Sequence, residues 1–431
     1  MRFSIYNIGC KVNFAEISEL REQFVGSGFE WVPFGEPAEL VIINTCTVTA
    51  NADADCRKTI RRAARQAPDA FIAVVGCYAQ LKSEEISKIE GVSAIFGGNE
   101  KFRILELLPS FAKPEQPYVF LSERGAEDFH AACSAENDAH TRVVLKIQDG
   151  CDYFCSYCAV PYARGSSRSL DYAEIAKHYE RIASAGGKEV ILSGINLGEY
   201  RSPSGENFAQ ALRLIDSLGL DIRTRISSIE PNLLTDDILE IVRESKSICK
   251  HFHIPLQSGS DRILKQMRRR YDTGFFGDLI AKIKKSMPDC GIGIDIITGF
   301  PGETDEDFAE AMAFCRSLDF TYLHVFSYSE REVATSQKLG GKVPAAKVKE
   351  RTLALRDLSD QKREAFYRSQ IGKIHRVIPE TREKKSGLIK AWTDNYVHVA
   401  FADGEINSDF QYVELIDMQG DYVLSAKQSE K

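Results

Sequence analysis

The sequence has no uninterrupted apolar run near the roughly 20 residues that a membrane-spanning helix needs. Its first residues, MRFSIYNIGCKVN, lack the basic and apolar regions of a signal peptide. It contains no GxxxxGK[ST] phosphate loop, and its eight histidines suggest no Ser-His-Asp arrangement. We therefore expect a cytoplasmic, globular protein that is not associated with a membrane and is neither a P-loop nor a triad enzyme.

The composition is that of an ordinary globular protein, with 43% hydrophobic and 27% charged residues among 431. At roughly 100–200 residues per domain, this length suggests two to four domains. The net charge of −7 excludes a basic nucleic-acid coat. It still allows local basic patches.

The first part of the chain alternates strand-like and helix-like segments. Strands are expected at residues 2–9, 40–45 and 71–76, and helices at 13–27, at 51–66 and from Ser83 onward. Short apolar runs separated by helical segments indicate βαβ units and a parallel sheet. The sequence therefore predicts an N-terminal parallel α/β domain over residues 1–113.

A second alternation begins at Arg142, after a small, polar segment that we interpret as a linker over residues 114–140. Six strands are expected at residues 143–149, 188–194, 222–229, 251–256, 291–300 and 321–328. Six βα units are too many for a small open sheet, and they favour a partial TIM-type (βα)6 barrel over residues 141–343. A charged helical connector over 344–370 and a small all-β barrel over 371–431 complete the predicted α/β chain.

The strongest motif is DGCDYFCSYC, which places three cysteines directly after the first predicted barrel strand. They are Cys151, Cys155 and Cys158. Three thiolates at this spacing can ligate three irons of a [4Fe–4S] cluster and leave the fourth iron open for a substrate. The alternative is a zinc site, but structural zinc needs four ligands and no Cys or His pair follows nearby.

Three more cysteines each follow a strand of the predicted N-terminal sheet. They are Cys10, Cys46 and Cys77. Because the carboxyl ends of parallel strands lie along one rim, we expect the three thiols to converge and to hold a second cluster. The alternative for each is a small buried hydrophobe, and we assign that structural role to the other five cysteines, Cys56, Cys133, Cys249, Cys290 and Cys315.

Several motifs resemble those of the methylthiotransferases of the radical S-adenosylmethionine (SAM) superfamily, closest to the branch that acts on threonylcarbamoyladenosine in tRNA. They are GCKVN, NTCTVT, GCYAQ, QDGCDYFCSYCAVPYARG and PLQSGSDRILKQMRR. The tail resembles a TRAM domain, and the resemblance spans essentially the whole chain. The run around Cys133 and the segment YDTGFFGDL depart from the family pattern.

The resemblance implies two [4Fe–4S] clusters, with the N-terminal cysteines holding an auxiliary cluster and the CxxxCxxC motif holding the SAM cluster. SAM should also contact small and polar residues after the barrel strands. The candidates are Gly194, Asn196, Ser228, Glu230, Gln257 and Gly299. By family analogy, the segment after the second strand serves the SAM amino group and the region near Glu230 serves the ribose. Turn geometry alone is the alternative explanation for each glycine.

Basic clusters occur in all three predicted domains, and RNA phosphates would need such cations. They comprise Arg57, Lys58, Arg61, Arg62 and Arg65; Lys265, Arg268, Arg269 and Arg270; and Lys373, Arg376, Arg382, Lys384, Lys385 and Lys390, with Trp392 and Tyr396 nearby. Solvated helix faces or strand edges are the alternative. Arg164 and Arg168, near the cluster loop, are candidate cations for a substrate carboxylate, for SAM or for a phosphate.

The resemblance implies an enzyme that methylthiolates C2 of threonylcarbamoyladenosine next to the tRNA anticodon. An electron donor of the flavodoxin or ferredoxin kind and a sulfur source would be its partners. The same chemistry on isopentenyladenosine or on a ribosomal-protein aspartate stays open. A non-enzymatic iron–sulfur sensor that binds RNA is the alternative from a different class.

Overall fold

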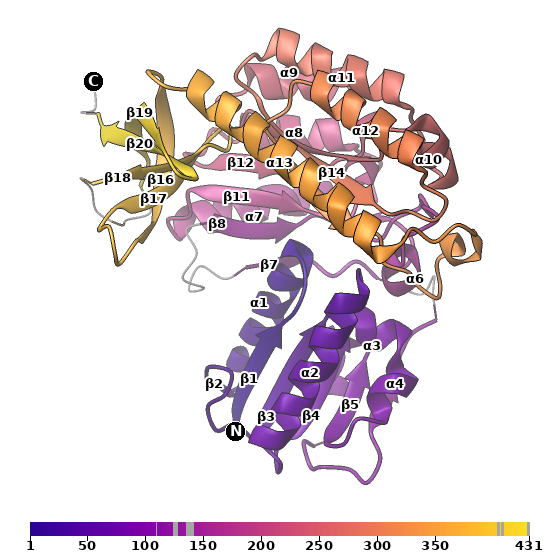
Figure 1. The fold of residues 1–431 in the computed structure, drawn as a ribbon. Helices are drawn as coiled ribbons and strands as arrows, with labels where there is room; N and C mark the ends of the chain where they lie inside the picture. Colours follow the sequence, from indigo (N-terminus) through magenta and orange to yellow (C-terminus); the bar gives the residue numbers. More distant parts are fainter. Residues whose placement is uncertain (109, 124–127, 135–141, 403–405, 407–408, 429–431) are drawn as a thin grey trace.

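The computed structural model describes the chain except residues 109, 124–127, 135–141, 403–405, 407–408 and 429–431. Figure 1 shows three parts: an N-terminal α/β unit, a central partial barrel above it, and a small β-barrel at one side of the central barrel. The predicted fold class is confirmed. The predicted domain limits stay predictions, and the predicted linker lies partly outside the described residues.

The N-terminal unit is a parallel sheet with helices on both faces, in the order β2-β1-β3-β4-β5-β6. Its strands are β1 (Arg2–Asn7), β2 (Glu30–Trp31), β3 (Leu40–Thr45), β4 (Phe71–Gly76), β5 (Val92–Phe96) and β6 (Tyr118–Phe120). Its helices are α1 (Lys11–Gly26), α2 (Ala50–Gln66), α3 (Cys77–Leu81), α4 (Ser83–Ser87), η1 (Glu100–Arg103) and α5 (Ile104–Leu107). The three predicted strands are present, and β3 and β4 are buried along their whole length.

The segment predicted as a linker contributes strands to both neighbouring sheets. Strand β6 pairs with β5 at the edge of the N-terminal sheet. Strand β7 (Ala132–Cys133) pairs antiparallel with the first barrel strand. This part of the chain therefore forms backbone hydrogen bonds to the two units that it connects.

The central unit contains all six predicted strands, in two parallel groups. The strands are β8 (Arg142–Lys146), β11 (Glu189–Ser193), β12 (Arg223–Ile226), β13 (His251–Gln257), β14 (Gly291–Thr298) and β15 (Tyr322–Ser327). The groups have the orders β12-β11-β8-β7 and β13-β14-β15. Isolated bridges Thr224↔Ile248 and Ser228↔His253 continue the curve between β12 and β13.

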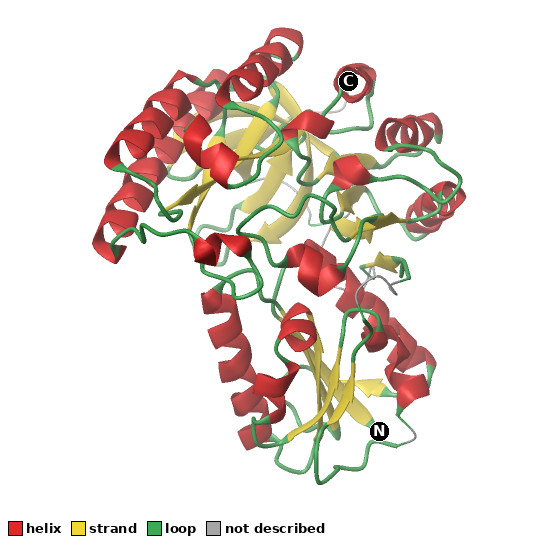
Figure 2. Ribbon diagram, turned by 90° about the vertical axis from the view of Figure 1, so that its right-hand side faces the viewer, coloured by secondary structure: helices red, strands yellow, loops and turns green. Residues whose placement is uncertain are grey.

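Helices cover the outside of this partial barrel, as Figure 2 shows. They are α7 (Tyr172–Ser184), α8 (Phe208–Ser217), α9 (Asp236–Glu244), α10 (Asp261–Gln266), α11 (Thr273–Ser286) and α12 (Asp305–Ser317). Shorter elements are β9 (Gln148–Asp149), α6 (Val160–Arg164), β10 (Arg168–Ser169), η2 (Leu197–Glu199), η3 (Pro231–Leu233) and η4 (Thr335–Lys338). The barrel core is aliphatic, built from the inner strand faces and the helix faces that cover them.

The predicted helical connector is one long helix, α13 (Ala345–Ser369), which crosses the barrel and leads into the tail (Figure 1). The tail is a closed barrel in the order β16-β17-β18-β20-β19, as predicted. Its strands are β16 (Ile374–Arg382), β17 (Ile389–Thr393), β18 (His398–Phe401), β19 (Gln411–Gln419) and β20 (Tyr422–Lys427). Phe366 and Tyr367 of α13 enter its core.

Two buried arginines of β12 fasten the tail barrel to the central barrel. Arg223 donates to the Trp392 carbonyl at 3.0 Å, and Arg225 donates to the carbonyls of Thr393 and Asp394, both at 3.0 Å. Glu189 accepts from both guanidinium groups, at 2.6 and 3.0 Å.

The backbone also approaches closely at this junction, beside Gly291. A Cβ atom at Gly291 would lie 2.1 Å from the Asn395 carbonyl oxygen. The tail barrel therefore docks in a defined orientation through buried charge and close backbone contact.

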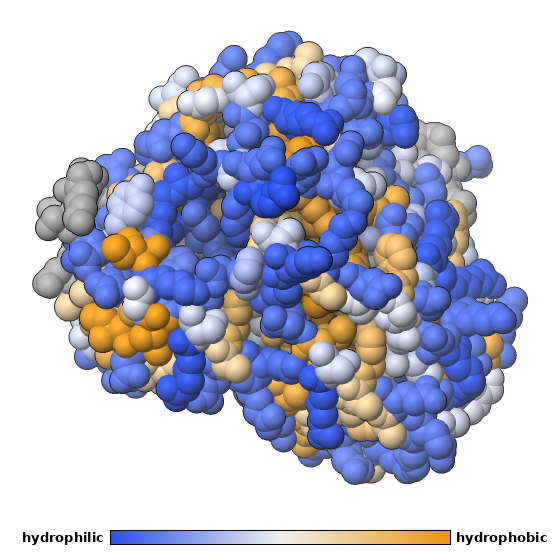
Figure 3. Space-filling view, turned by 90° about the horizontal axis from the view of Figure 1, so that it is seen from above, coloured by the Kyte–Doolittle hydropathy of each residue, from blue (hydrophilic) through white to orange (hydrophobic). Residues whose placement is uncertain are grey.

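The outer surface over the barrel helices is mainly hydrophilic, with apolar residues in separate patches (Figure 3). Among the described residues, no helix combines the length and apolar character required to cross a bilayer.

The Glu189 carboxylate should be a main determinant of stability. Burial acts to raise its pKa, but the guanidinium groups of Arg223 and Arg225 outweigh burial and lower the pKa to about 2. The substitution Glu189→Gln removes the negative charge between two buried cations. It should cost about 3–5 kcal/mol in unfolding free energy at pH 7, as measured by urea denaturation.

The pH dependence provides a second check. Because the folded pKa is depressed, the contribution of Glu189 is fully present above about pH 4.5 and is lost as pH falls toward 2. The difference in unfolding free energy between wild type and the Glu189→Gln variant should thus be constant from pH 8 to 5. Arg213→Gln, which removes an exposed ion pair, is the control and should cost under about 0.5 kcal/mol. Equal costs for both variants would contradict this account.

Candidate active site

The first cysteine triplet lies on the loop between β9 and α6, at the carboxyl ends of the barrel strands. The loop is tightly folded, because the Cys158 amide donates to the Cys155 carbonyl at 3.0 Å and the Cys151 amide donates to Gly165 at 3.2 Å. All three thiols are partly exposed. Burial is the main cause that raises the pKa of Cys151, and Cys158 and Cys155 raise it further, so the three sulfurs lie within electrostatic range of one another.

Hydrogen bonds to a neighbouring barrel segment hold this loop in place. The Ser156 hydroxyl donates to the Gln266 carbonyl at 2.8 Å, and the Ser156 amide donates to Met267 at 3.1 Å. Gly150 enters the loop with φ +70°, and a Cβ there would lie 2.0 Å from the Ser166 carbonyl oxygen. Position 150 therefore requires glycine.

Arg269 contacts the cysteine loop directly. Its Nη1 atom lies 3.1 Å from Cys155 Sγ, and its Nη2 atom forms an ion pair with Glu230. The Arg269 side chain is buried, so this cation stands beside the thiol without competing water. Burial raises the pKa of Cys158 to about 12, which makes it a neutral thiol until a metal displaces its proton.

The second triplet converges as the sequence suggested. Cys46 directly follows β3, Cys77 directly follows β4, and Cys10 lies between β1 and α1. Burial raises the pKa of Cys46 to about 11, with further contributions from Cys77 and Cys10. The three thiols therefore lie near one another at the carboxyl edge of the N-terminal sheet.

Close backbone packing brings these strand ends together. Gly9 has φ +148°, and a Cβ there would lie 2.2 Å from Asn13 Nδ2. The Asn13 amide donates to the Ile8 carbonyl at 3.2 Å, which fixes the turn that carries Cys10. At Gly76, φ is +100° and a Cβ would lie 2.6 Å from the Thr45 carbonyl oxygen.

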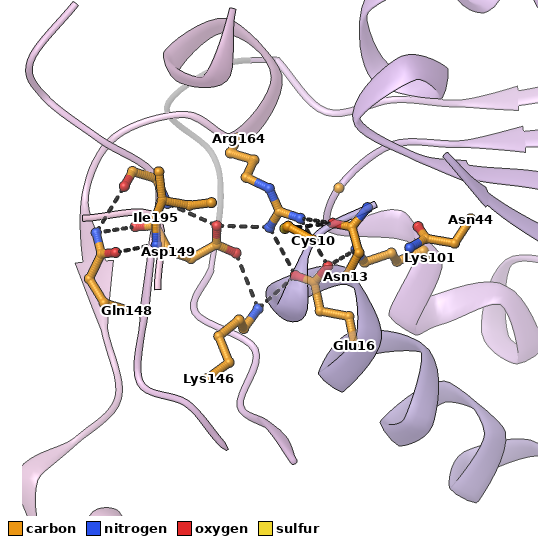
Figure 4. A network of polar contacts seen from close by, with 12 residues as sticks. Cys10, Asn13, Glu16, Asn44, Lys101, Lys146, Gln148, Asp149, Arg164 and Ile195 are labelled. Atoms are coloured by element: carbon orange, nitrogen blue, oxygen red, sulfur yellow. Dashed lines mark hydrogen bonds and ion pairs between the residues drawn. The ribbon is translucent and has the colours of Figure 1, made fainter. Parts of the chain in front are cut away.

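A buried network of charged side chains connects α1 of the N-terminal unit with the central barrel, and Figure 4 shows it beside Cys10. Arg164, at the end of the helix that follows the first triplet, donates to Glu16 of α1 at 3.0 and 3.1 Å. It also donates to Asp149 at 2.9 Å and to Asn13, whose side-chain oxygen lies 3.8 Å from Cys10 Sγ. One guanidinium group thus contacts both cysteine-bearing regions.

Two lysines complete this network. Lys101 and Lys146 donate to Glu16 at 2.5 and 2.9 Å, and Lys146 also reaches Asp149 at 3.1 Å. These side chains are at most 5% exposed. Three cations therefore face two carboxylates, and the surplus positive charge lies near Cys77, where burial raises the thiol pKa while Arg164 and Lys101 act to lower it.

Two of the predicted SAM-binding residues follow β11 and lie against the cysteine loop. Gln148 accepts from the amides of Ile195 and Asn196 at 2.9 and 2.8 Å and donates to the Gly150 carbonyl at 2.8 Å. The Asn196 side chain is buried, yet neither of its polar atoms has a hydrogen-bond partner among the described residues. A ligand that satisfies this amide would account for it.

The other predicted SAM-binding residues differ in their surroundings. Ser228 and Gln257 are partly exposed after β12 and at the end of β13, and Gln257 holds φ +67°, an uncommon conformation for a residue other than glycine. Burial raises the pKa of Glu230, although Arg269 opposes the shift. The Gly299 amide donates to Glu303, and a Cβ there would lie 2.5 Å from Val348, so packing alone accounts for this glycine and its SAM contact stays a prediction.

Several functional positions were missed or misassigned from the sequence. Arg164 and Arg168 were candidate cations for a substrate, but both donate to Asp149 within the protein. Arg269 belongs to a predicted RNA-binding cluster but is buried beside Cys155. Arg57, from another predicted RNA-binding cluster, also has a partner within the protein, because it donates to Tyr78. Arg61 and Arg65 of that cluster are exposed on α2. The five remaining cysteines are all buried, as expected.

A group of titratable side chains lies on neighbouring barrel strands. His253 Nε2 is 2.7 Å from Asp295 Oδ1, and His324 Nδ1 is 3.9 Å from the same oxygen. Nearby, the ring of Tyr396 from the tail barrel stacks on His251 with a centroid distance of 4.5 Å. The tail barrel therefore contributes a side chain to the interior face of the central barrel.

Comparisons with known proteins agree with this geometry. Residues 145–315 match the Radical SAM superfamily, and residues 2–97 match the Uncharacterized protein family UPF0004. The chain is 37% identical to the threonylcarbamoyladenosine tRNA methylthiotransferase MtaB of Bacillus subtilis (strain 168), covering 93% of this chain and 90% of that protein. It is 34% identical to the protein of the same name from Aquifex aeolicus (strain VF5), covering 93% and 96%.

Among solved structures, the chain is similar in fold to the radical S-adenosylmethionine methyltransferase TsrM from Kitasatospora setae. The TM-score is 0.56 at 14% identity, covering 75% of this chain and 72% of that chain.

The buried network should control how firmly the N-terminal unit docks on the barrel. Glu16→Gln leaves three buried cations facing one carboxylate. The midpoint temperature of the first thermal unfolding transition should therefore fall by several degrees. The control is Glu22→Gln, an exposed position on the same helix, which should leave the transition within about one degree. Differential scanning calorimetry of both variants tests this, and equal shifts would show that the network does not stabilise the docking.

Proposed function

This chain belongs to the threonylcarbamoyladenosine tRNA methylthiotransferases of the radical SAM superfamily, and we propose that it methylthiolates C2 of N6-threonylcarbamoyladenosine next to the tRNA anticodon. One observation supports this most strongly. Two cysteine triplets stand at the carboxyl ends of two separate parallel sheets, and Arg164 connects them through buried contacts. A substrate atom placed between the sheets would be within reach of both.

Membership of the radical SAM superfamily implies a [4Fe–4S] cluster and SAM. The residues present fit them, because three thiols gather on one loop and the buried Asn196 amide beside it has no hydrogen-bond partner among the described residues. When bound, this pair supplies the one-electron chemistry that removes a hydrogen atom from the substrate.

Within this site we assign roles to the residues that surround the first triplet. Cys151, Cys155 and Cys158 hold the cluster, and Arg269 compensates charge at Cys155. Gly194 and Asn196 contact the amino-acid part of SAM. Further polar contacts, including those to the ribose, come from Ser228, Glu230 and Gln257. In this assignment Gly299 serves the turn before α12 and contacts no ligand.

The N-terminal triplet holds an auxiliary [4Fe–4S] cluster in this proposal. Cys10, Cys46 and Cys77 supply three thiolates, and the surplus positive charge of the buried network favours an anionic centre there. When bound, that cluster supplies the sulfur that is transferred as a methylthio group. The protein aligns the two centres by fixing one sheet against the other.

The partners follow from this chemistry. The enzyme needs tRNA, a flavodoxin- or ferredoxin-like electron donor and a sulfur source, and we place it in the cytoplasm because its tRNA substrate is there. For RNA phosphates we favour the cations that remain exposed, such as Arg61, Arg65, Arg268 and Lys384. The tail barrel also packs against the central barrel through hydrogen bonds from Arg223 and Arg225. Its deletion would therefore disturb more than RNA binding.

The alternative functions have weaker support. The chain is 37% and 34% identical to the two relatives named for threonylcarbamoyladenosine, but 32% identical to a tRNA-2-methylthio-N(6)-dimethylallyladenosine synthase of Fusobacterium nucleatum. The higher identities favour the threonylcarbamoyl substrate. These relatives are enzymes by name, which disfavours an iron–sulfur sensor.

Two clusters per chain give a simple iron prediction. Anaerobic reconstitution should approach about eight irons per chain, from two cubes of four. Replacing Cys10, Cys46 and Cys77 with alanine should remove about half of the iron and spare the reductive cleavage of SAM to 5′-deoxyadenosine. As a control, Cys315→Ala alters a buried cysteine outside both triplets and should retain all the iron. Full iron in the triple variant would exclude the N-terminal cluster.

The substrate is tested directly with two tRNAs. Reduced, reconstituted enzyme and SAM are incubated with tRNA that carries threonylcarbamoyladenosine or isopentenyladenosine. Nucleoside mass spectrometry should detect 2-methylthio product only from the first, because a site that pairs with the threonylcarbamoyl carboxylate would reject an apolar substituent. Product only from the second would assign the other branch while leaving the two-cluster chemistry intact, and no 5′-deoxyadenosine at all would favour the sensor.

A further inference from the structure

A cavity of about 440 Å³ lies beside Cys10, where the three parts of the chain meet. Its walls come from the start of α1, from β8 and β11 of the central barrel, and from the tail barrel. Val144 and Ile191 give one wall an apolar surface, while Thr381 and Glu380 of β16 offer polar groups. The cavity is therefore mixed in character and belongs to no single domain.

Lys11, the residue that follows Cys10, lines this cavity. No ion pair or hydrogen bond of its ammonium group occurs within the described part of the chain. The nearby charges do not neutralise it, since Arg142 and Arg225 are cations and Glu189 already accepts from two arginines. Arg142, also on the cavity wall, pairs with Glu380 at 2.7 Å. Among the residues that the structure describes, Lys11 is thus a cation without a protein counter-charge.

The substrate chemistry explains what could meet this cation, and this step rests on the proposed function. The reacting C2 atom lies in the same six-membered ring of adenine as C6, which carries the N6 substituent. If C2 lies beside the cluster held by Cys10, the N6 substituent must lie within a side chain's reach of Cys10. A threonylcarbamoyl substituent carries a carboxylate, a hydroxyl and a methyl group, so it matches a cavity with a cation, polar groups and an apolar wall.

We propose that Lys11 binds the carboxylate of the threonylcarbamoyl group and thereby selects this substrate over one with an apolar N6 substituent. Thr381 and the Arg142–Glu380 pair face the polar atoms of the substituent, and Val144 and Ile191 face its methyl group. An isopentenyl group in the same cavity would leave the Lys11 charge desolvated and unpaired, which disfavours its binding. The cations that the sequence suggested for this role, Arg164 and Arg168, are engaged with Asp149.

The test uses full-length, reconstituted enzyme and two anticodon stem–loops that differ at one group. One carries threonylcarbamoyladenosine, and the other carries its carboxamide analogue, which has the same shape without the charge. The wild-type enzyme should prefer the carboxylate stem–loop over the carboxamide one. Lys11→Gln should lower kcat/KM for the carboxylate stem–loop by about 10- to 100-fold, mainly through KM, and should abolish the preference. Lys11→Arg should retain most of it.

The control variant is Lys342→Gln, whose side chain is 91% exposed, and it should keep the wild-type preference. An unchanged preference in Lys11→Gln would overturn the proposal. Loss of iron from Lys11→Gln would also overturn it, because Lys11 would then balance the charge of the cluster at Cys10. Failure of wild type to modify either stem–loop, with methylthiolation of an isopentenyladenosine one, would instead refute the proposed function.

Discussion

The contact between Arg164 and Glu16 is the interaction on which the geometry of the site depends. Burying five charged groups is costly unless each meets its partner at close range. Here Glu16 is satisfied only if α1 of the N-terminal unit lies where Lys101, Lys146 and Arg164 converge. The apolar contact between α1 and the barrel is small, built around Ala15, Val144 and Ile191. Specific charge pairing, rather than extensive apolar burial, therefore sets the position of one cysteine triplet relative to the other.

The tail barrel is positioned by the same kind of interaction at a second junction. Glu189 lies between Arg223 and Arg225. The other donors of these two arginines reach backbone carbonyls of the tail barrel, at residues 376 and 392–394, and the Asp394 carboxylate. This junction holds Tyr396 against His251 and at the wall of the cavity beside Cys10. The tail thus shapes the site, in addition to any contact with RNA. A simple division between a catalytic barrel and an RNA-binding tail does not describe this molecule.

The sequence predicted the elements well because local patterns determine them. Continuous apolar runs at residues 40–45 and 71–76 mark fully buried strands, and a cysteine after each run identified the shared edge of the sheet. The charged residues could not be assigned in this way. Arg164 and Glu16 are 148 positions apart, and Arg269 lies 114 positions from Cys155, so no local pattern shows that they meet. The role of Gly299 could not be decided from sequence, because a glycine needed for packing looks the same in sequence as one near a ligand.

The arrangement separates two tasks that share one substrate base. In the proposed function, reaction at C2 uses both thiol triplets, and their alignment depends on the buried charges, which are paired within the protein. The proposed recognition of the N6 substituent uses a charge that is not already paired, and Lys11, next to Cys10, has no ion pair among the described residues. A paired charge maintains geometry, and an unpaired charge in a cavity selects a ligand. Substrate choice can therefore change at the cavity without disturbing the alignment of the two centres.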